Sequence, residues 1–256
     1  MDLHLKDKVV IVSGGANGIG KAISIQLIEE KAIPILFDKD EAAGKRFVKQ
    51  FPRSHFMEVD LNDSFACRKS VEKTEKKLGR IEGLVNNAGF NDAIGLEKGS
   101  PQKFTQSLNN NTAHYYSLAH YCLPFLKQSM GSIVNIASKV AITGQGNTSG
   151  YAAAKGAILS LTREWAVELL PSSIRVNAVL PAEVWTPLYE SWLKSFPDPK
   201  EKKRQIESRI PLGNRMTTAE EIANMVVFLL SDRCSHVTGQ WMSVDGGYVH
   251  LDRSIS

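Results

Sequence analysis

A tyrosine and a lysine stand four residues apart in the stretch YAAAK, as Tyr151 and Lys155. On a helix, side chains at positions i and i+4 share one face, so the two groups would lie side by side. A tyrosine ordinarily ionises near pH ~10, and a neighbouring ammonium group favours the phenolate and so lowers the pKa of the phenol. The pair could therefore act as a general base. Because Y-x-x-x-K is common by chance, the rest of the chain must decide its meaning.

A glycine-rich turn near the N-terminus, SGGANGIG at 13–20, has the residue types that bind a pyrophosphate. Gly14, Gly18 and Gly20 would let the chain turn tightly and bring backbone amides to an anion at the start of a helix. An ordinary strand-to-helix turn is the alternative. The nucleotide reading is favoured by Asp38, which ends the next apolar run and could accept hydrogen bonds from ribose hydroxyls.

Asp38 also predicts NAD as the cofactor, with NADP less favoured. Its carboxylate would repel a 2′-phosphate, and Asn17 brings no compensating positive charge to the turn. Lys39 is adjacent, but its side chain should point away from that of Asp38 because side chains alternate along a strand. Asp60, which closes the third apolar run, could accept from the adenine amino group or act as a helix N-cap.

Short apolar runs alternate with longer helix-like stretches along the whole chain. The runs are nearly continuous in apolar character, as strands buried on both faces of a sheet should be. They predict seven strands, at 8–12, 34–37, 55–59, 83–87, 132–137, 174–180 and 241–244. Helices are expected at 20–31, 64–78, 112–126, 149–170 and 218–231. This order requires right-handed crossovers between parallel strands. The predicted fold class is therefore α/β: a single Rossmann-like doubly wound domain over 1–256, with a seven-stranded parallel sheet flanked by helices.

The bulk composition limits the partners and the compartment. The net charge of +4 is spread along the chain in runs that also contain acids, which argues against nucleic-acid binding. No apolar run approaches the ~20 residues of a membrane helix, and the N-terminus lacks the order of a signal peptide. Cys67, Cys122 and Cys234 are far apart and in no metal-ligand spacing. We expect a cytoplasmic protein with no metal site and no membrane or nucleic-acid partner.

Further motifs follow in an order that resembles the short-chain dehydrogenase/reductase family. NNAG at 86–89 ends the fourth predicted strand, Asn111 follows it, and Ser138 ends the fifth in VNIAS. VDGG lies at 244–247. Together with the glycine-rich turn, Asp38 and YAAAK, these motifs cover nearly the whole chain.

The resemblance implies a role for each matching position. Tyr151 would be the catalytic acid/base, and Ser138 would bind the substrate hydroxyl or carbonyl. Lys155 would lower the pKa of Tyr151 and bind the nicotinamide ribose, while Asn111 would position a water of the proton relay. Ser13 replaces the threonine that is usual in the family, and either hydroxyl could make the local turn bond. The expected cofactor-binding residues are Ser13, Gly14, Asn17, Gly18, Ile19, Gly20, Asp38, Asp60, Leu61, Asn87, Ala88, Gly89, Tyr151, Lys155, Pro181, Val184 and Thr186.

The stretch PAEVWTPLY at 181–189 suits neither helix nor strand. In the family it leads into a variable segment that covers the substrate, here about 187–212, so Glu183 and Trp185 are expected near the pocket mouth. A carboxylate accepts two neighbouring hydroxyls, and an indole face packs against a sugar ring. An unpaired carboxylate buried against a steroid or an acyl chain would be costly. The alternative is that Glu183 pairs with a basic residue of the covering segment and Trp185 fills a gap.

The other candidates for substrate contact are polar. Gln145 and Asn147 lie between Ser138 and Tyr151, in a stretch that shapes the pocket in the family. The expected substrate-binding set is Ser138, Gln145, Asn147, Tyr151, Glu183 and Trp185. Weaker candidates are His114, Trp192 and, in the C-terminal run, His250, Asp252 and Arg253.

Two longer stretches, PAEVWTPLYESWL and TGQWMSVDGGYVHLDR, resemble the group of L-fucose and related aldose 1-dehydrogenases. That resemblance implies NAD-dependent oxidation of an aldose at C1 to its lactone. The alternatives are a hydroxysteroid or 3-oxoacyl reductase of the same fold, and a non-catalytic nucleotide-sensing protein. The set of Asn111, Ser138, Tyr151 and Lys155 argues against a sensor, which needs no acid/base relay. Apolar residues on more than one face of 101–127 and 149–170 predict a homotetramer.

Overall fold

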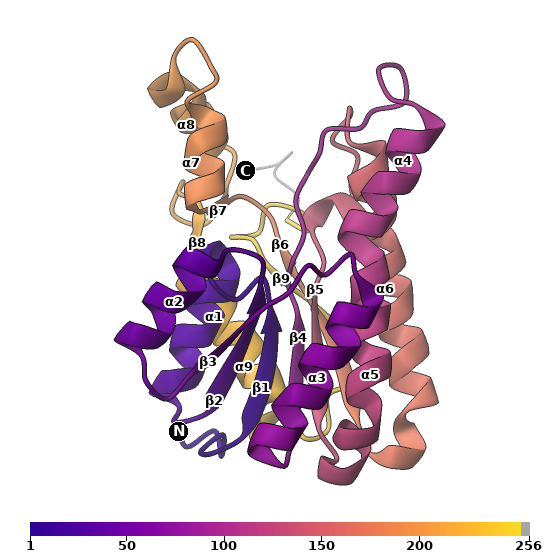
Figure 1. Ribbon diagram of the computed structural model, residues 1–256. Helices are drawn as coiled ribbons and strands as arrows, with labels where there is room; N and C mark the ends of the chain where they lie inside the picture. The colour runs from indigo at the N-terminus through magenta and orange to yellow at the C-terminus, as the bar shows by residue number, and fades with distance from the viewer. Residues whose placement is uncertain (252–256) are drawn as a thin grey trace.

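All neighbouring strands of the central sheet run parallel, and the sheet order is β3-β2-β1-β4-β5-β6-β9 (Figure 1). This is a computed structural model in which residues 1–251 are described. The seven strands are β1 (Val9–Ser13), β2 (Ile33–Asp38), β3 (His55–Glu58), β4 (Gly83–Asn86), β5 (Ser132–Ile136), β6 (Arg175–Pro181) and β9 (Trp241–Val244). The predicted seven-stranded parallel sheet is confirmed.

Helices cover both faces of the sheet, as the doubly wound order requires (Figure 1). One face carries α1 (Gly18–Glu29), α2 (Glu41–Gln50) and α9 (Ala219–Leu230). The other carries α3 (Ser64–Leu78), α5 (His114–Ser129) and α6 (Ser149–Glu168). Within residues 1–251, no helix is both long enough and apolar enough to cross a membrane.

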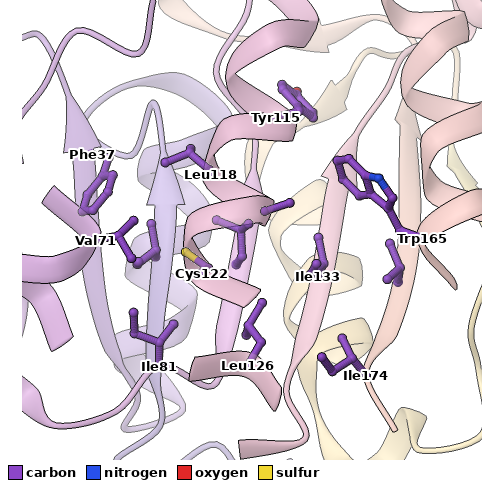
Figure 2. Packing of buried hydrophobic residues seen from close by; sticks show 14 of the residues in the cluster. Phe37, Val71, Ile81, Tyr115, Leu118, Cys122, Leu126, Ile133, Trp165 and Ile174 are labelled. Atoms are coloured by element: carbon purple, nitrogen blue, oxygen red, sulfur yellow. The ribbon is translucent and has the colours of Figure 1, made fainter. Parts of the chain in front are cut away.

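The core divides into two layers because successive side chains of a strand point to opposite faces. On β1, Val9 and Ile11 pack with α3, α5 and α6, whereas Val10 and Val12 pack with α1 and α9. Figure 2 shows the first layer, with Tyr115, Leu118, Cys122 and Leu126 along α5. Near-complete burial on both sides explains why the strands contain few polar residues.

The carboxyl edge of the sheet is where the chain places its irregular elements. β1 and β4 are neighbours although their helices lie on opposite faces, which makes the point between them the topological switch point where such folds bind ligands. On one side of this edge lies α4 (Pro101–Leu108), which continues as a π-helical turn (Asn109–Ala113) into α5. On the other side rise α7 (Pro187–Leu193) and α8 (Pro199–Glu207), both within the segment 187–212 (Figure 1).

Short elements complete the chain. The strands β7 (Val184–Trp185) and β8 (Thr217–Thr218) pair with each other at the base of α7. Three 3₁₀ turns span Lys139–Ala141, Leu170–Ser172 and Asp232–Cys234.

Candidate active site

The glycine-rich turn forms a narrow cradle at the start of α1. A Cβ at Gly20 would lie 2.0 Å from the carbonyl oxygen of Gly14, so only glycine lets the turn close this tightly. Gly18 has φ +52, and a Cβ there would meet nothing nearer than Thr186, at 3.9 Å. Asn17 is the N-cap of α1 but its side chain makes no capping bond. The first amides of α1 are therefore available to a phosphate group, and the residues fit a dinucleotide.

Ser13 joins two strands rather than making a local turn bond. Its hydroxyl accepts hydrogen bonds from the amides of Asn87 (2.9 Å) and Ala88 (3.1 Å). In return, the Asn87 side chain donates to the carbonyl oxygens of Ser13 (2.9 Å) and Gly14 (3.3 Å). The expectation of a local bond was wrong, because the buried ends of β1 and β4 bring the two motifs together. Asn87 therefore stabilises the glycine-rich turn by hydrogen bonding to its backbone.

Asp38 lies at the end of β2, beside the turn. Its carboxylate accepts from the amides of Ala16 (3.0 Å) and Asp40 (3.0 Å). Asn17 donates to a second carboxylate, that of Asp40, at 2.9 Å. Two acids therefore stand where the adenosine ribose would lie, which is an unfavourable place for a 2′-phosphate.

The remaining cofactor candidates lie along the same edge. Asp60 is exposed and accepts from the amide of Asn62 (3.0 Å), whereas the N-cap of α3 is Asp63. The alternative role of Asp60 as a helix cap is therefore wrong. Thr186 caps α7 by accepting from the amide of Tyr189 (3.2 Å), which leaves its hydroxyl proton free to donate. The last four candidates also lie at this edge: two are half-buried, Ile19 and Leu61, and two are buried, Pro181 and Val184.

The structure brings Ser138, Tyr151 and Lys155 together at the carboxyl end of β5. Ser138 follows the strand and is hydrogen bonded to Tyr151 on α6. One turn further along α6, Lys155 is buried, with its Nζ 5.6 Å from the centre of the Tyr151 ring. The i, i+4 spacing thus places the two side chains on one face of the helix, as predicted.

Burial dominates the ionisation of both groups. It raises the pKa of Tyr151 to about 12, opposed by the hydrogen bond with Ser138 and assisted by the negative charge of Asp92. It lowers the pKa of Lys155 to about 7, so the lysine is only partly charged near neutral pH. Burial therefore sets the direction of the Tyr151 pKa in this site, and the expected contribution of Lys155 to lowering it stays a prediction. In a dry site the cost of desolvating the phenolate exceeds the attraction of a half-charged neighbour.

Asn111 lies in the π-helical turn, and both polar atoms of its side chain have a partner in the protein. Its Oδ1 accepts from the amide of Phe90 (2.8 Å), and its Nδ2 donates to the carbonyl oxygen of Ser107 (3.0 Å). A Cβ at Gly89 would lie 2.9 Å from Asn111 Oδ1 and 3.5 Å from Lys155 Nζ, so glycine is needed for this close approach. We expect any relay water here to be bound by the backbone of the π-helical turn, because the side-chain amide already has its partners.

Glu183 is not free to accept two sugar hydroxyls, and this expectation needs correction. One carboxylate oxygen forms an ion pair with Lys139, and the other accepts from the Tyr189 hydroxyl on α7 at 2.6 Å. The two charged side chains are only 10% and 15% exposed. Lys139 also lies over the ring of Tyr248, at 4.3 Å. The pairing alternative was the better one, although the cation, Lys139, follows Ser138 instead of belonging to the covering segment.

The other expected substrate contacts differ in how available they are. Trp185 is 38% exposed, and its ring is covered by Lys203 of α8, whose Nζ lies 4.5 Å from the ring centre. Gln145 and Asn147 are exposed and make no side-chain hydrogen bond within residues 1–251. These two amides are therefore free to bind a ligand.

The weaker candidates are explained by packing. His114 is buried, its Nε2 lies 3.2 Å from the carbonyl oxygen of Asn110, and burial followed by the nearby Lys155 charge lowers its pKa to about 4. Trp192 packs edge-on against Tyr189, and His250 is hydrogen bonded to Ser243. Asp252 and Arg253 lie outside the described residues.

Three residues near the site did not stand out in the sequence. Lys139 follows Ser138 directly, and Tyr115 lies four residues after Asn111. Asp92 follows NNAG in the stretch FND, and its charge reaches Tyr151. Its Oδ1 accepts from Ser107 Oγ at 2.9 Å, while its second oxygen has no hydrogen-bond partner in the part of the chain that the structure describes. The available signal was position: Lys139 directly follows Ser138, whereas Asp92 and Tyr115 lie three and four residues after Gly89 and Asn111.

Comparisons with known proteins agree over nearly the whole chain. The enoyl-(acyl carrier protein) reductase family model matches residues 14–249. L-fucose dehydrogenase of Bos taurus is 37% identical over 248 residues, which cover 96% of this chain and 91% of the bovine protein. The 3-oxoacyl-(acyl-carrier-protein) reductase FabG of Thermotoga maritima is 35% identical over 252 residues, covering 96% of this chain and 100% of that protein. The crystal structure of Cj0485 dehydrogenase has a TM-score of 0.96 at 49% identity, covering 100% of this chain and 99% of the other.

Proposed function

This chain belongs to the short-chain dehydrogenase/reductase family, and on that premise we propose that it is an NAD-dependent dehydrogenase that oxidises an aldose at C1. Members of this family are oxidoreductases that act on small molecules. The similarity to a bovine L-fucose dehydrogenase supports an L-fucose-like aldose as the substrate.

Each catalytic residue then has a defined task. Ser138 donates a hydrogen bond to the anomeric oxygen, and Tyr151 takes the proton from that hydroxyl. Bound NAD would supply the acceptor for the C1 hydride and one additional positive charge near the phenol. Loss of the proton and the hydride converts the C1 hydroxyl into the carbonyl of a lactone, which water then opens. Lys155 would bind the nicotinamide ribose and, when charged, stabilise the Tyr151 phenolate, while Asn111 would position a water of the proton relay.

The observation that carries the sugar assignment is the carboxylate of Asp92 beside the catalytic tyrosine. Asp92 is half-buried, its charge raises the pKa of Tyr151, and only one of its oxygens is taken by Ser107. A substrate rich in hydroxyl groups would satisfy the second oxygen, whereas a steroid or an acyl chain that covered Asp92 would remove its water and leave it unpaired. The free amides of Gln145 and Asn147 favour the same class of substrate.

A substrate panel tests this assignment through the appearance or loss of NADH absorbance. Aldoses that differ at one stereocentre, hydroxysteroids and 3-oxoacyl thioesters are compared by kcat/KM. We expect turnover of aldoses only. The identity to FabG supports the 3-oxoacyl reductase as the second candidate, and preferential reduction of oxoacyl thioesters would establish it instead. NAD binding without any turnover would indicate a nucleotide sensor.

Replacing Asp38 with alanine should weaken the preference for NAD. The variant loses the acceptor for the ribose hydroxyls and the charge that repels a 2′-phosphate, so kcat/KM with NAD should fall about tenfold and that with NADP should rise. The control is Asp63→Ala, which removes the α3 cap away from the glycine-rich turn. A wild-type enzyme that already prefers NADP would contradict this interpretation of Asp38.

We also propose that the enzyme is a homotetramer. Apolar side chains are exposed on α4, on α6 and just beyond α6, including Phe104 (37%), Val167 (67%) and Leu170 (57%). Burial of such groups against other subunits would stabilise an oligomer. Light scattering of the purified protein should give the mass of four chains, and a monomer at micromolar concentration would refute the proposal.

A cytoplasmic location completes the proposal. Cys67, Cys122 and Cys234 are all buried and unpaired, as expected for a protein that folds in a reducing compartment. Burial raises the pKa of Cys67 to about 11, which keeps that thiol protonated and unreactive.

A further inference from the structure

The buried ammonium group of Lys155 is bound by two neutral oxygens. Its Nζ donates to the carbonyl oxygen of Ile136 at 2.7 Å and to the hydroxyl of Tyr115 at 3.1 Å. The Tyr115 hydroxyl in turn donates to the same carbonyl oxygen at 2.9 Å. Within residues 1–251, Lys155 has no ion pair. An ammonium group has three N–H donors, so one N–H of Lys155 remains for the ribose side of the site.

We propose that Tyr115 is a positioning residue for catalysis: its hydroxyl stabilises the charged form of Lys155 and directs the remaining N–H toward Tyr151 and the cofactor. This inference assumes the catalytic roles of Tyr151 and Lys155 but not the identity of the substrate. The Tyr115 hydroxyl is hydrogen bonded to Lys155 and to the carbonyl oxygen of Ile136. Its effect passes through Lys155.

The local structure explains how an α5 side chain reaches this point. The π-helical turn Asn109–Ala113 inserts an irregularity just before Tyr115, and such turns recur at functional sites. Tyr115 is fully buried at the upper end of the apolar layer in Figure 2, above Leu118 on the same helix. Phenylalanine would fill the same space. A buried tyrosine oxygen is usually hydrogen bonded. Here the hydroxyl accepts from Lys155 and donates to the carbonyl oxygen of Ile136, the last residue of β5.

The groups that face Lys155 are neutral, so the charged form of Lys155 depends on its hydrogen bond with Tyr115. From α5 these are His114, which is neutral because burial lowers its pKa to about 4, and Tyr115, whose pKa burial raises well above its usual value. From α6 the neighbour is Tyr151, and beyond it lies Asp92, whose charge is directed at Tyr151. Burial lowers the pKa of Lys155 to about 7, so a lost hydrogen bond to the charged form would neutralise it at physiological pH.

The test compares Tyr115→Phe with Tyr116→Phe, which removes the same atom from an exposed tyrosine one position along the chain. The pKa of Lys155 is measured in the protein without cofactor, by NMR titration of labelled lysine side chains. The Lys155 resonance is assigned by its absence in Lys155→Gln. Tyr115→Phe should lower the pKa of Lys155 by about one unit, because a hydrogen bond to a charged group is lost. Tyr116→Phe should leave it unchanged.

Kinetics with the best alcohol substrate provide the second readout. A less charged Lys155 stabilises the Tyr151 phenolate less, so the pKa of Tyr151 rises and the acid limb of kcat moves to higher pH. At pH 7 the loss should be about tenfold, shrinking as the pH rises. If the pKa of Lys155 stays unchanged and activity falls equally at every pH, Tyr115 is only structural and the proposal is overturned.

Two further outcomes remain distinguishable. If Tyr115→Phe does not fold, Tyr115→Met fills the site without an oxygen and replaces it in both measurements. If the enzyme proves inactive on aldoses, the proposed substrate fails. The Lys155 titration still decides the role of Tyr115, because it needs no substrate.

Discussion

Replacing Tyr151 with phenylalanine is expected to lower kcat about 10³-fold, the contribution typical of a lost general acid/base. The substitution removes only the oxygen atom, so the ring still packs on α6 beside Lys155 and Ser138. NADH binding, measured by fluorescence titration, should therefore be nearly unchanged. The separation of turnover from cofactor binding is the signature of a group that acts in proton transfer alone.

The exposed neighbour of Tyr115 provides the control for this prediction. Tyr116 is 58% exposed. Tyr116→Phe removes its hydroxyl and should keep wild-type kcat. In the wild-type enzyme, activity should fall as the pH decreases, because the phenolate is the active form and burial raises the pKa of Tyr151 to about 12 in the empty site. Activity within about tenfold of wild type in Tyr151→Phe would show that another group accepts the proton.

The regular elements of the sheet were predictable because their side-chain pattern is set by burial. Each predicted strand overlaps an observed one, and the α9 capping box at Thr218 and Glu221 forms where its residues indicate. α2 was missed because only Ala43, Gly44 and Phe47 of it are buried and two of these are small, so no run of large apolar residues marks the helix. α7 and α8 were also missed, although each begins with a capping residue followed by a proline, Thr186–Pro187 and Asp198–Pro199, which is a helix-start signal.

The parts of the candidate site that a local motif positions were predicted from the sequence. The hydrogen-bond and ion-pair partners that come from distant parts of the chain were not. YAAAK brings Tyr151 and Lys155 onto one helix face by spacing alone. The partners of Glu183 lie 44 and 6 residues away, at Lys139 and Tyr189, and no local pattern connects them. The π-helical turn that aims Tyr115 at Lys155 is likewise a hydrogen-bond shift with no signal in residue type.

The Lys139–Glu183 pair should be essential for stability. Lys139→Met leaves the buried carboxylate of Glu183 without its cation, a change that typically costs 3–5 kcal/mol for a buried pair, so about 3 kcal/mol is expected by urea unfolding. The double variant Lys139→Met/Glu183→Gln should recover much of this loss, since no charge is left unpaired. The control is Lys194→Met, which breaks the exposed i, i+4 pair with Glu190 on α7 and should cost at most ~1 kcal/mol.

The same pair decides between the two interpretations of Glu183. Its carboxylate joins the segment after Ser138 to α7 through Tyr189, so Glu183→Gln should disturb both the serine and the covering helix. We therefore expect kcat/KM to fall about tenfold, by the same factor for the best aldose and for each of its deoxy analogues. If Glu183 instead bound a sugar hydroxyl, the penalty would vanish on the analogue that lacks that hydroxyl, because the wild-type enzyme would have no bond left to lose. A penalty confined to one hydroxyl, in a variant of unchanged stability, would restore Glu183 as a substrate ligand and refute the structural role.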